Sequence, residues 1–336
     1  MDFICGSFDA DGRISLDCLQ ADKSCRGDIV TCVLEARNLS KWYRQVIAVN
    51  RISFSIEPGV VGLLGPNGAG KSTLMRLMAG QLRPSQGGIT IFGKSVWNQS
   101  VLFHRIGFCP EQDSFYENLT GIEFLTVLLC LHGYSESEAG CRAELALQKV
   151  DLVHAANKTI AAYSKGMRQR IKLAQAIGHD PEVLILDEPL SGMDPVVRHE
   201  TIRLIREWGH EGKCVIVSSH ILHEIEAMTQ NILLLHNGQM LAQGDIGQVR
   251  ALIDEHPHSI QIRCSNPRRM AEALVGFSDV VSIRFRSKEN SLIIESSKPD
   301  QFYERLPEVM LRHEIGLEEI TSPDDNLQAV FRYLVK

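Results

Sequence analysis

The chain has 336 residues, of which 44% are apolar and 23% are charged, and these proportions are ordinary for a globular protein that buries its own core. Its formal net charge of -6 argues against a dedicated nucleic-acid-binding domain, because such domains are usually basic. No stretch of the sequence reaches the roughly 20 apolar residues that a membrane-spanning helix needs, and the apolar-rich run Phe124–Leu131 predicts a buried helix. The first residues lack the basic and apolar regions of a signal peptide.

Residues 1–31 show no clear periodicity, and we expect them to form a poorly ordered extension. The chain has nine cysteines, and four of them crowd its first 32 residues without forming a C-x-x-C pair: Cys5, Cys18, Cys25 and Cys32. A zinc site in this extension is the alternative, although the spacing gives it little support. The other cysteines are scattered along the chain, as is typical of proteins in a reducing cytosol.

From residue 32 to residue 245, apolar segments, Gly-rich turns and helical segments alternate. This alternation predicts an α/β domain with a largely parallel sheet. From residue 246 to residue 336 the character changes to a small α+β appendage. Its predicted strands and amphipathic helices are 258–264, 280–288 and 291–297 for the strands, and 267–277 and 301–315 for the helices.

A Gly-rich loop follows the apolar strand 60–64 and precedes a helical run from Leu74. The loop matches G-x-x-x-x-G-K-[ST] in the strand–loop–helix context that this motif requires. Its residues, which we expect to hold the phosphates of ATP, are Gly65, Pro66, Asn67, Gly68, Ala69, Gly70, Lys71, Ser72 and Thr73. Glycines let consecutive N–H groups point into one concavity, and the helix N-terminus adds partial positive charge. Lys71 would bring a full charge to the β- and γ-phosphates, Ser72 would ligate Mg²⁺, and Thr73 would add a phosphate contact.

The apolar segment 183–186 ends in two acids, Asp187 and Glu188. A buried strand tip that carries two carboxylates is costly unless a cation lies beside it, and Mg²⁺ held by Asp187 would supply that charge. Glu188 would then face the attacking water. Adjacent strand residues point to opposite faces, so the strand end must bend if both acids serve one site. The alternative is an exposed strand terminus whose charges are solvated.

Two further features are ambiguous from the residues alone. Ser164 is a good helix N-cap, and the helix that it predicts ends near Gly178. With Gly166 it would form a second anion site, or it would simply cap the helix. His220 follows the apolar strand 214–217 and would be either a phosphate sensor or a satisfied polar group.

The order of these motifs resembles that of the nucleotide-binding subunits of ABC transporters over about residues 34–245. The resemblance predicts an α/β P-loop NTPase cassette of the ABC type. This fold has a mixed, largely parallel core sheet, an antiparallel β region and a helical subdomain at about 113–162. The motifs that complete it are a Q-loop ending in Gln112, the signature YSKGM-RQR, a D-loop ending in Asp194-Pro195, the switch residue His220 and the aromatic Tyr43. Tyr163, Lys165 and Met167 replace three residues of the common signature LSGGQ.

The resemblance implies catalytic roles for three residues. Glu188 would be the general base or water-polarising carboxylate, His220 would contact the γ-phosphate, and Gln112 would approach Mg²⁺ and the water. The Mg²⁺ donors would be Ser72, Gln112 and Asp187. The expected cofactors are therefore ATP and Mg²⁺.

The resemblance also implies a composite site. Ser164 and Gly166 would bind ATP held on an opposing subunit, and Asp194 would lie at the dimer interface. Tyr43 would stack on adenine, since every base offers a π-face. The alternative for Tyr43 is a half-buried strand aromatic.

We therefore predict a cytoplasmic ATPase subunit, peripheral at the membrane, that powers export through separate polytopic membrane-spanning subunits. It would pair with a second ATPase subunit, a copy or a paralogue, and would not bind nucleic acid. The YSKGM variant and the appendage resemble those of exporters of drugs, antibiotics, polysaccharides or ions.

The alternative class is a soluble, non-transport ABC ATPase. A ribosome-acting member would usually carry two cassettes, and a chromosome-organising member would carry long heptad segments, but this sequence shows one cassette and no such segments. A P-loop kinase or GTPase would not need the signature, D-loop and switch histidine together.

Overall fold

The structure is a computed structural model that describes residues 32–247, 258–286 and 291–321. The predictions for the extension 1–31 lie outside these residues. Of the four cysteines that the zinc alternative would use, the structure describes Cys32. The Cys32 thiol is exposed and donates to the Leu34 carbonyl at 3.2 Å. Within the described ranges, no helix combines the length and the apolar character needed to cross a lipid bilayer.

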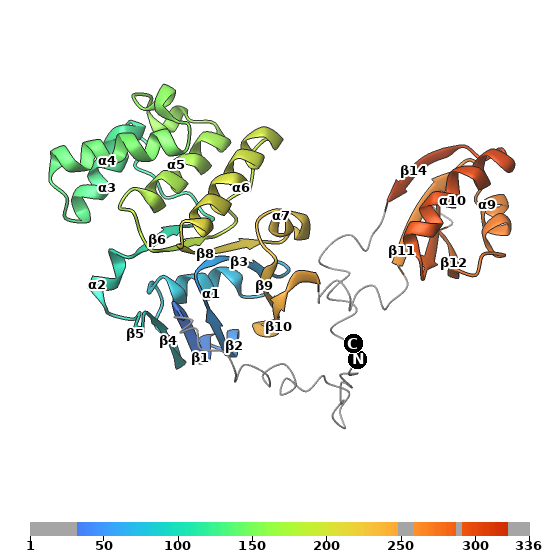
Figure 1. The fold of residues 1–336 in the computed structure, drawn as a ribbon, viewed down its shortest axis with the longest axis horizontal. Coiled ribbons are helices and arrows are strands. Elements are labelled where there is room, and N and C mark those ends of the chain that lie inside the picture. Colours follow the sequence, from blue (N-terminus) through green and yellow to red (C-terminus); the bar gives the residue numbers. More distant parts are fainter. Residues whose placement is uncertain (1–31, 248–257, 287–290, 322–336) are drawn as a thin grey trace. The chain divides into compact units, whose positions relative to one another are not determined.

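A six-stranded sheet forms the centre of the cassette, in the order β10-β9-β3-β8-β7-β6 (Figure 1). Five of its strands run parallel and β10 pairs antiparallel with β9, so the predicted largely parallel sheet is confirmed. Its strands are β3 Gly59–Leu64, β6 Ile106–Cys109, β7 Val183–Leu186, β8 Cys214–Ser219, β9 Asn231–His236 and β10 Gln239–Asp245. The near-continuous apolar runs of β7 and β8 are buried on both faces, as expected of parallel strands covered on both sides.

A second, antiparallel sheet has the order β2-β1-β4-β5. Its strands are β1 Leu34–Tyr43, β2 Val46–Ile56, β4 Gln86–Ile91 and β5 Lys94–Ser95. Helix α1, Lys71–Met78, lies between the two sheets, because Leu74 and Met78 share one apolar core with Ile52 of β2 and Ile216 of β8 (Figure 1). The helix begins at Lys71 rather than near Leu74, since Gly70 already caps it.

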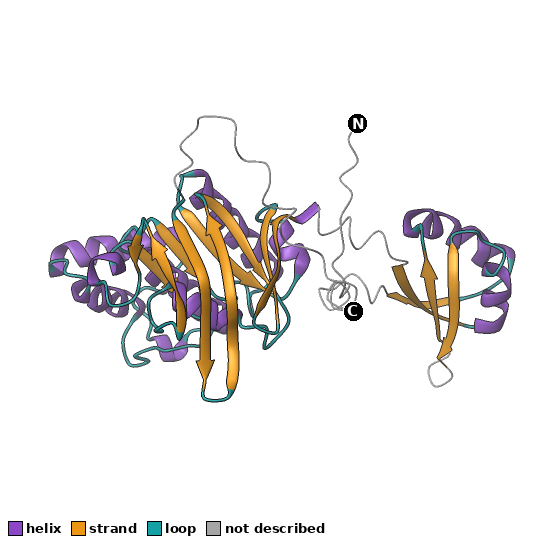
Figure 2. Ribbon diagram, turned by 90° about the horizontal axis from the view of Figure 1, so that it is seen from below, coloured by secondary structure: helices purple, strands orange, loops and turns teal. Residues whose placement is uncertain are grey.

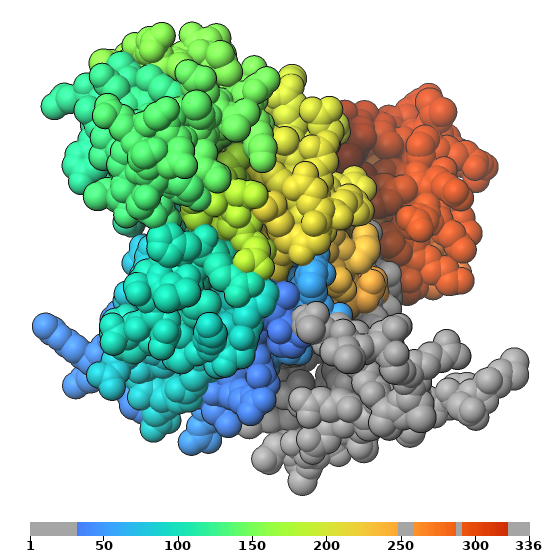
Figure 3. Space-filling view, turned by 60° about the vertical axis from the view of Figure 1, so that its left-hand side comes forward, coloured from blue at the N-terminus to red at the C-terminus, as the bar shows by residue number. Residues whose placement is uncertain are grey.

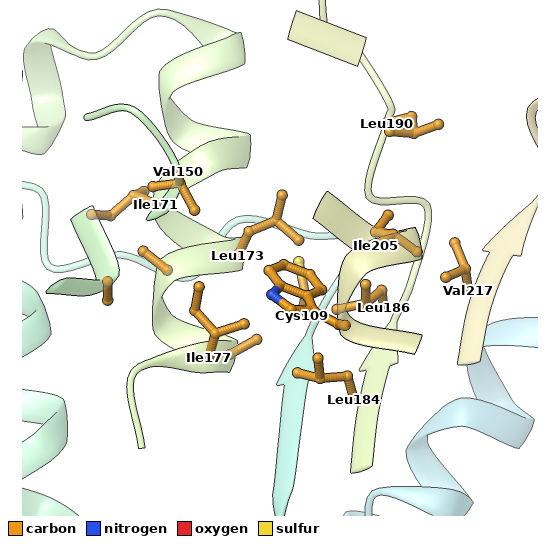
Figure 4. Packing of buried hydrophobic residues seen from close by; sticks show 14 of the residues in the cluster. Cys109, Val150, Ile171, Leu173, Ile177, Leu184, Leu186, Leu190, Ile205 and Val217 are labelled. Carbon is orange, nitrogen blue, oxygen red and sulfur yellow. The ribbon is translucent and has the colours of Figure 1, made fainter. Parts of the chain in front are cut away.

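Helices cover the opposite face of the central sheet. They are α3 Gly121–Leu131, α4 Glu136–Lys149, α5 Lys165–Ile177, α6 Pro195–His210 and α7 Leu222–Glu226, with 3₁₀ turns at Val153–Ala155 and Ile160–Ala162. The short helix α2, Ser100–Phe103, lies on the α1 side instead, where its Leu102 shares the core with Leu74. Ile171, Leu173 and Ile177 of α5 face Cys109 of β6 and Leu184 of β7 in the core (Figure 4). In the space-filling view the green residues, which include α4, form a lobe above the teal and blue ones (Figure 3).

Helix α3 corrects one prediction. Phe124, Leu125 and Leu129 are buried, but Val127 and Leu131 remain 43% and 78% exposed. The helix is therefore half-exposed rather than buried, because only one of its faces packs against α4 and α5.

The C-terminal residues form a four-stranded antiparallel sheet in the order β12-β13-β11-β14. Its elements are β11 His258–Cys264, α9 Pro267–Leu274, β12 Val280–Arg286, β13 Ser291–Ser296, α10 Pro299–Arg312 and β14 Leu317–Thr321. This order of elements is the split β-α-β-β-α-β arrangement, drawn by element type in Figure 2. Ile260 and Ile294 of the sheet pack against Leu274 of α9 and Phe302 of α10. The predicted α+β character is confirmed, and β14 is an additional strand.

Candidate functional site

The Gly-rich loop 65–70 joins the end of β3 to the start of α1. A Cβ atom at Gly65 would lie 2.6 Å from the Leu235 carbonyl oxygen, and one at Gly70 would lie 2.4 Å from the Ala48 carbonyl oxygen. Gly70 also has a φ of 102°, in the left-handed region. Only glycine fits these two positions, because the neighbouring backbone approaches too closely for a side chain.

Lys71 is the first residue of α1 and is buried, with 7% of its surface exposed. Its ammonium group donates to the Gly65 carbonyl at 2.8 Å and to the Pro66 carbonyl at 3.4 Å. A cation at a helix N-terminus is placed where the helix dipole favours an anion. Ser72 and Thr73 follow in the same turn, and both are partly buried. The loop and α1 thus concentrate positive potential at one point.

The acidic end of β7 bends as the sequence predicts. Glu188 has a φ of 48°, and this left-handed backbone lets two adjacent acids turn into one region. The Ser218 hydroxyl connects them: it donates to Asp187 Oδ1 at 2.7 Å and accepts from the Glu188 amide at 2.8 Å. The carboxyl ends of neighbouring parallel strands meet at one sheet edge, and for this reason Ser218 of β8 reaches the end of β7.

Glu188 brings three groups of the predicted site together. Its Oε1 lies 3.6 Å from Lys71 Nζ and its Oε2 lies 3.0 Å from His220 Nδ1. Burial raises the pKa of the Glu188 carboxyl, and the charges of Lys71 and His220 partly oppose that rise. A buried carboxylate with a raised pKa beside a lysine and a histidine is suited to general-base chemistry.

Gln112 and Tyr43 lie outside the hydrogen bonds and ion pairs described for Lys71, Glu188 and His220. Gln112 is exposed, although Lys172 anchors the residues beside it, at 2.8 Å to the Glu111 carbonyl and 3.0 Å to Asp113 Oδ1. Tyr43 ends β1, is 43% exposed, and has Lys41 Nζ 5.4 Å from its ring centroid. The roles of Gln112 and Tyr43 therefore stay predictions.

The signature segment begins α5. Ser164 is the N-cap of this helix, and its exposed hydroxyl accepts from the Met167 amide at 3.3 Å. Gly166 has no atom within 4 Å of the place where a Cβ would lie, so its backbone is accessible on that side. Lys165 instead lies across the D-loop, because a Cβ at Gly192 would be 2.2 Å from Lys165 Cε.

Asp194 caps α6 within its own chain. Its Oδ1 accepts from the amides of Val196 and Val197 at 3.1 and 3.0 Å, while the residue remains exposed. A place at a dimer interface stays a prediction for Asp194, and the observed capping is an additional, local role.

Sequence reasoning missed two residues that hold the acidic turn. One is Ser218, described above, and the other is Gln169 of α5, whose buried amide donates to the Glu188 carbonyl at 3.3 Å. Gln169 lies within the signature RQR and faces inward on an amphipathic helix. The apolar face that the sequence predicts, through Met167 and Ile171, does not include Gln169, and Lys172 is buried beside it.

A cavity of about 580 Å³ lies elsewhere in the cassette. It is lined by residues of α3 and α5 together with His104 and the segment at β6. Three histidines gather here: the rings of His132 and His179 stack at 4.3 Å, and His104 meets His132 edge-on at 5.9 Å. This cavity contains none of the nucleotide motifs.

Comparison with known proteins identifies the family. The model of the ABC transporter family matches residues 49–191. The bacitracin transport ATP-binding protein BcrA of Enterococcus faecalis is 38% identical over 224 residues, which are 66% of this chain and 72% of BcrA. The chain belongs to the ABC transporter ATP-binding proteins. As a member of this family it binds and hydrolyses ATP as the ATPase subunit of a transporter.

Two relatives of this ABC ATPase extend over its C-terminal part as well. The daunorubicin/doxorubicin resistance ATP-binding protein DrrA of Streptomyces peucetius is 31% identical over 303 residues, 90% of this chain and 92% of DrrA. The Nod factor export ATP-binding protein I of Sinorhizobium fredii is 32% identical over 315 residues, 93% of this chain and 88% of that protein. These matches exceed the length of the cassette, so the appendage is shared with them.

The fold of the cassette is shared with solved structures. An ATP-binding subunit of an ABC transporter matches with a TM-score of 0.60 at 30% identity, covering 65% of this chain and 92% of that one. A nucleotide-free cassette matches at 22% identity with the same TM-score, 0.60, over 66% of this chain and 95% of that one. Both agree with the observed sheets and helices.

Proposed function

We propose that this chain hydrolyses ATP with Lys71, Glu188 and His220 as its central residues and thereby powers export through separate membrane-spanning subunits. The convergence of these three side chains carries the proposal, since Glu188 lies within 3.6 Å of Lys71 and 3.0 Å of His220. Lys71 neutralises phosphate charge, Glu188 accepts a proton from the attacking water, and His220 orients Glu188 and the γ-phosphate. Positioning and charge neutralisation supply most of the catalysis in phosphoryl transfer.

The loop 65–73 holds the phosphates in this proposal, and Tyr43 stacks on the base. Ser72, Asp187 and Gln112 would hold Mg²⁺. These donors offer a hydroxyl, a carboxylate and an amide oxygen, which are the hard oxygen ligands that Mg²⁺ prefers. When bound, the ion would neutralise charge between the phosphates. In the described part of the chain, no group of three His, Cys, Asp or Glu side chains could hold a metal ion.

The proposed site is completed by a second ATPase subunit. Ser164 and Gly166 present an exposed helix N-terminus rather than a site closed within one chain, and Asp194 is exposed in the neighbouring loop. One known relative of the same fold, at 23% identity, is described as a dimeric ABC transporter cassette. The second subunit would be a copy of this chain or a paralogue.

Export is proposed from the relatives, whose names describe bacitracin transport, daunorubicin/doxorubicin resistance and Nod factor export. We divide the chain into an extension, 1–31, an ATPase domain, 32–245, and an accessory domain, 246–336. The helical subdomain 113–162 would contact the membrane subunits on the cytoplasmic face. Val127 and Leu131 of α3 are exposed apolar residues on its surface, and they would suit such a contact.

Glu188→Gln tests the catalytic assignment. The amide keeps the shape of the side chain but cannot accept the proton, so we expect turnover to fall at least about 100-fold while ATP binding persists and ATP-bound dimers accumulate. Phosphate release and size-exclusion chromatography with ATP measure these effects, with the exposed Glu200→Gln as control. Turnover at the original rate in Glu188→Gln would show that the assignment is wrong.

A further inference from the structure

Glu224 is a buried carboxylate for which the nucleotide motifs provide no role. It lies on the short helix α7 and is 5% exposed. Its Oε2 accepts from the Ser219 hydroxyl at 2.8 Å, and its Oε1 lies 3.5 Å from Arg198 Nη1 of α6. Burial of an ionised carboxylate is unfavourable without such partners, so this arrangement is specific rather than incidental.

Ser219 carries the contact to the switch histidine. Its hydroxyl oxygen also accepts from the Ile221 amide at 3.0 Å. One hydroxyl therefore braces the backbone on both sides of His220, whose imidazole reaches Glu188. If Glu224 moves, Ser219 loses its acceptor, and the position of His220 is no longer fixed from that side.

Arg198 carries the contact to the D-loop. Its Nη2 donates to the Met193 carbonyl at 3.4 Å, and Met193 directly precedes Asp194. The Met193 side chain is itself buried, with its sulfur 3.3 Å from the Thr201 hydroxyl. The guanidinium thus lies between the D-loop backbone and Glu224, and its planar shape can serve both at once.

We propose that Ser219, Glu224 and Arg198 form a positioning link that couples the orientation of His220 to the conformation of the D-loop. The contacts described for these three residues do not include Lys71 or Glu188. They would therefore act through His220. The inference rests on the proposed role of His220 in ATP hydrolysis. Since the D-loop carries Asp194, expected at the contact with the second subunit, the link would make His220 respond to the arrival of that subunit.

The test compares Glu224→Gln, Arg198→Met and Ser219→Ala with the wild-type chain in steady-state ATPase assays. We expect kcat to fall about 10-fold or more in Glu224→Gln and Arg198→Met and less in Ser219→Ala, with KM for ATP within about threefold of wild type. Ser219→Ala removes a single hydroxyl and so reports on the link even if a charge change prevents folding. The matched control is Arg203→Met and Glu207→Gln, an exposed ion pair on α6 at 3.7 Å, which should leave kcat unchanged.

A double-variant cycle separates positioning from simple stabilisation. In the background of His220→Ala, we expect Glu224→Gln to cause no further loss of kcat, because the link acts only through His220. An equal further loss in that background, or a wild-type kcat in folded Glu224→Gln and Ser219→Ala, would overturn the proposal. If His220→Ala itself retains the wild-type kcat, the proposed function of His220 is wrong, and this outcome is distinct from failure of the link.

Discussion

The cassette and the proposed accessory domain 246–336, which we call the C-terminal domain, differ in how many charged side chains they bury. In the cassette, Lys71, Asp187, Glu188 and Glu224 are all at least nine-tenths buried and lie at or near strand ends. In the described part of the C-terminal domain, Asp279 is the only buried charged side chain. Other charged side chains there form exposed pairs, as Arg263 does with Glu319 at 2.6 Å on the sheet and Arg312 does with Glu308 at 2.7 Å on α10.

Strand direction explains this difference. Parallel strands end at the same edge of a sheet, so the loops after β3, β7 and β8 converge and their polar side chains can share one site. In the C-terminal sheet, each strand is antiparallel to its neighbours in the order β12-β13-β11-β14, so the ends of neighbouring strands point to opposite edges. Chemistry is therefore concentrated in the cassette, and substitutions in the two regions should have different consequences.

The largest expected effect comes from Lys71→Met. Removal of the buried cation should lower ATPase turnover by about 100-fold or more, as loss of a preorganised charge does elsewhere. Phosphate release measures the loss, and Lys94→Met on the exposed strand β5 is the control. If Lys71→Met keeps a turnover within a factor of about two of wild type, the proposed concentration of chemistry in the cassette is contradicted at this residue.

The next effect concerns pH and His179. Burial lowers the pKa of His179 from 6.5 to about 4, with help from neighbouring His132. In the unfolded chain the His179 imidazole therefore becomes protonated near pH 6.5, whereas in the folded chain it becomes protonated only near pH 4. The free energy of unfolding should therefore be highest above pH 6.5. It should fall by up to about 3 kcal/mol as the pH decreases to about 4.

His179→Gln should flatten this dependence, because the glutamine does not titrate. Denaturant unfolding followed by tryptophan fluorescence measures it, since Trp42, Trp97 and Trp208 all lie in the cassette. The exposed His199→Gln serves as control. Equal slopes of stability against pH in wild type and His179→Gln would contradict the assignment.

A smaller effect is expected from Arg305→Met in the C-terminal domain. Arg305 Nη1 lies 3.2 Å from Asp279 Oδ1, and the other carboxylate oxygen has no hydrogen-bond partner within the described structure. Loss of the partner would leave a buried charge uncompensated and cost about 2 kcal/mol, below the usual range because Arg305 is half-exposed. Amide exchange over 258–321 measures the loss, and the ATPase rate should not change.

The double variant Asp279→Asn with Arg305→Met should recover most of that stability, because it removes both charges together. If the single and double variants are equally unstable, the contact of the Arg305 guanidinium with the Phe277 ring, 5.9 Å from Cζ to the ring centroid, matters more than the ion pair.

The smallest effect is expected from Arg263→Met. Its pairs with Glu318 and Glu319 are exposed to solvent, and such ion pairs contribute less than about 1 kcal/mol. Amide exchange of the same segment provides the comparison with Arg305→Met. If Arg263→Met lowers the stability as much as Arg305→Met does, burial is not what makes one ion pair contribute more than the other.

Much of the fold was predictable because its signals are local. The phosphate loop, the apolar strand before Asp187 and the Ser164 cap each depend on a few consecutive residues, and the structure has the corresponding elements. The strands 258–264 and 291–297 were likewise predictable from their alternation. The prediction of a buried α3 was wrong, since apolar content alone does not tell which face of a helix meets a neighbour.

The sequence by itself predicted which side chains would carry phosphate, metal and acid–base chemistry, because motif spacing fixes their order along adjacent elements. Only the tertiary structure decided which groups surround Glu188. Ser218, Gln169 and His220 are 30, 19 and 32 residues away from it in the chain, and no local pattern reports such a separation. Their meeting follows from the parallel order β6-β7-β8 and from α5 packing on its face, which bring distant strand ends and one helix to a single edge of the sheet.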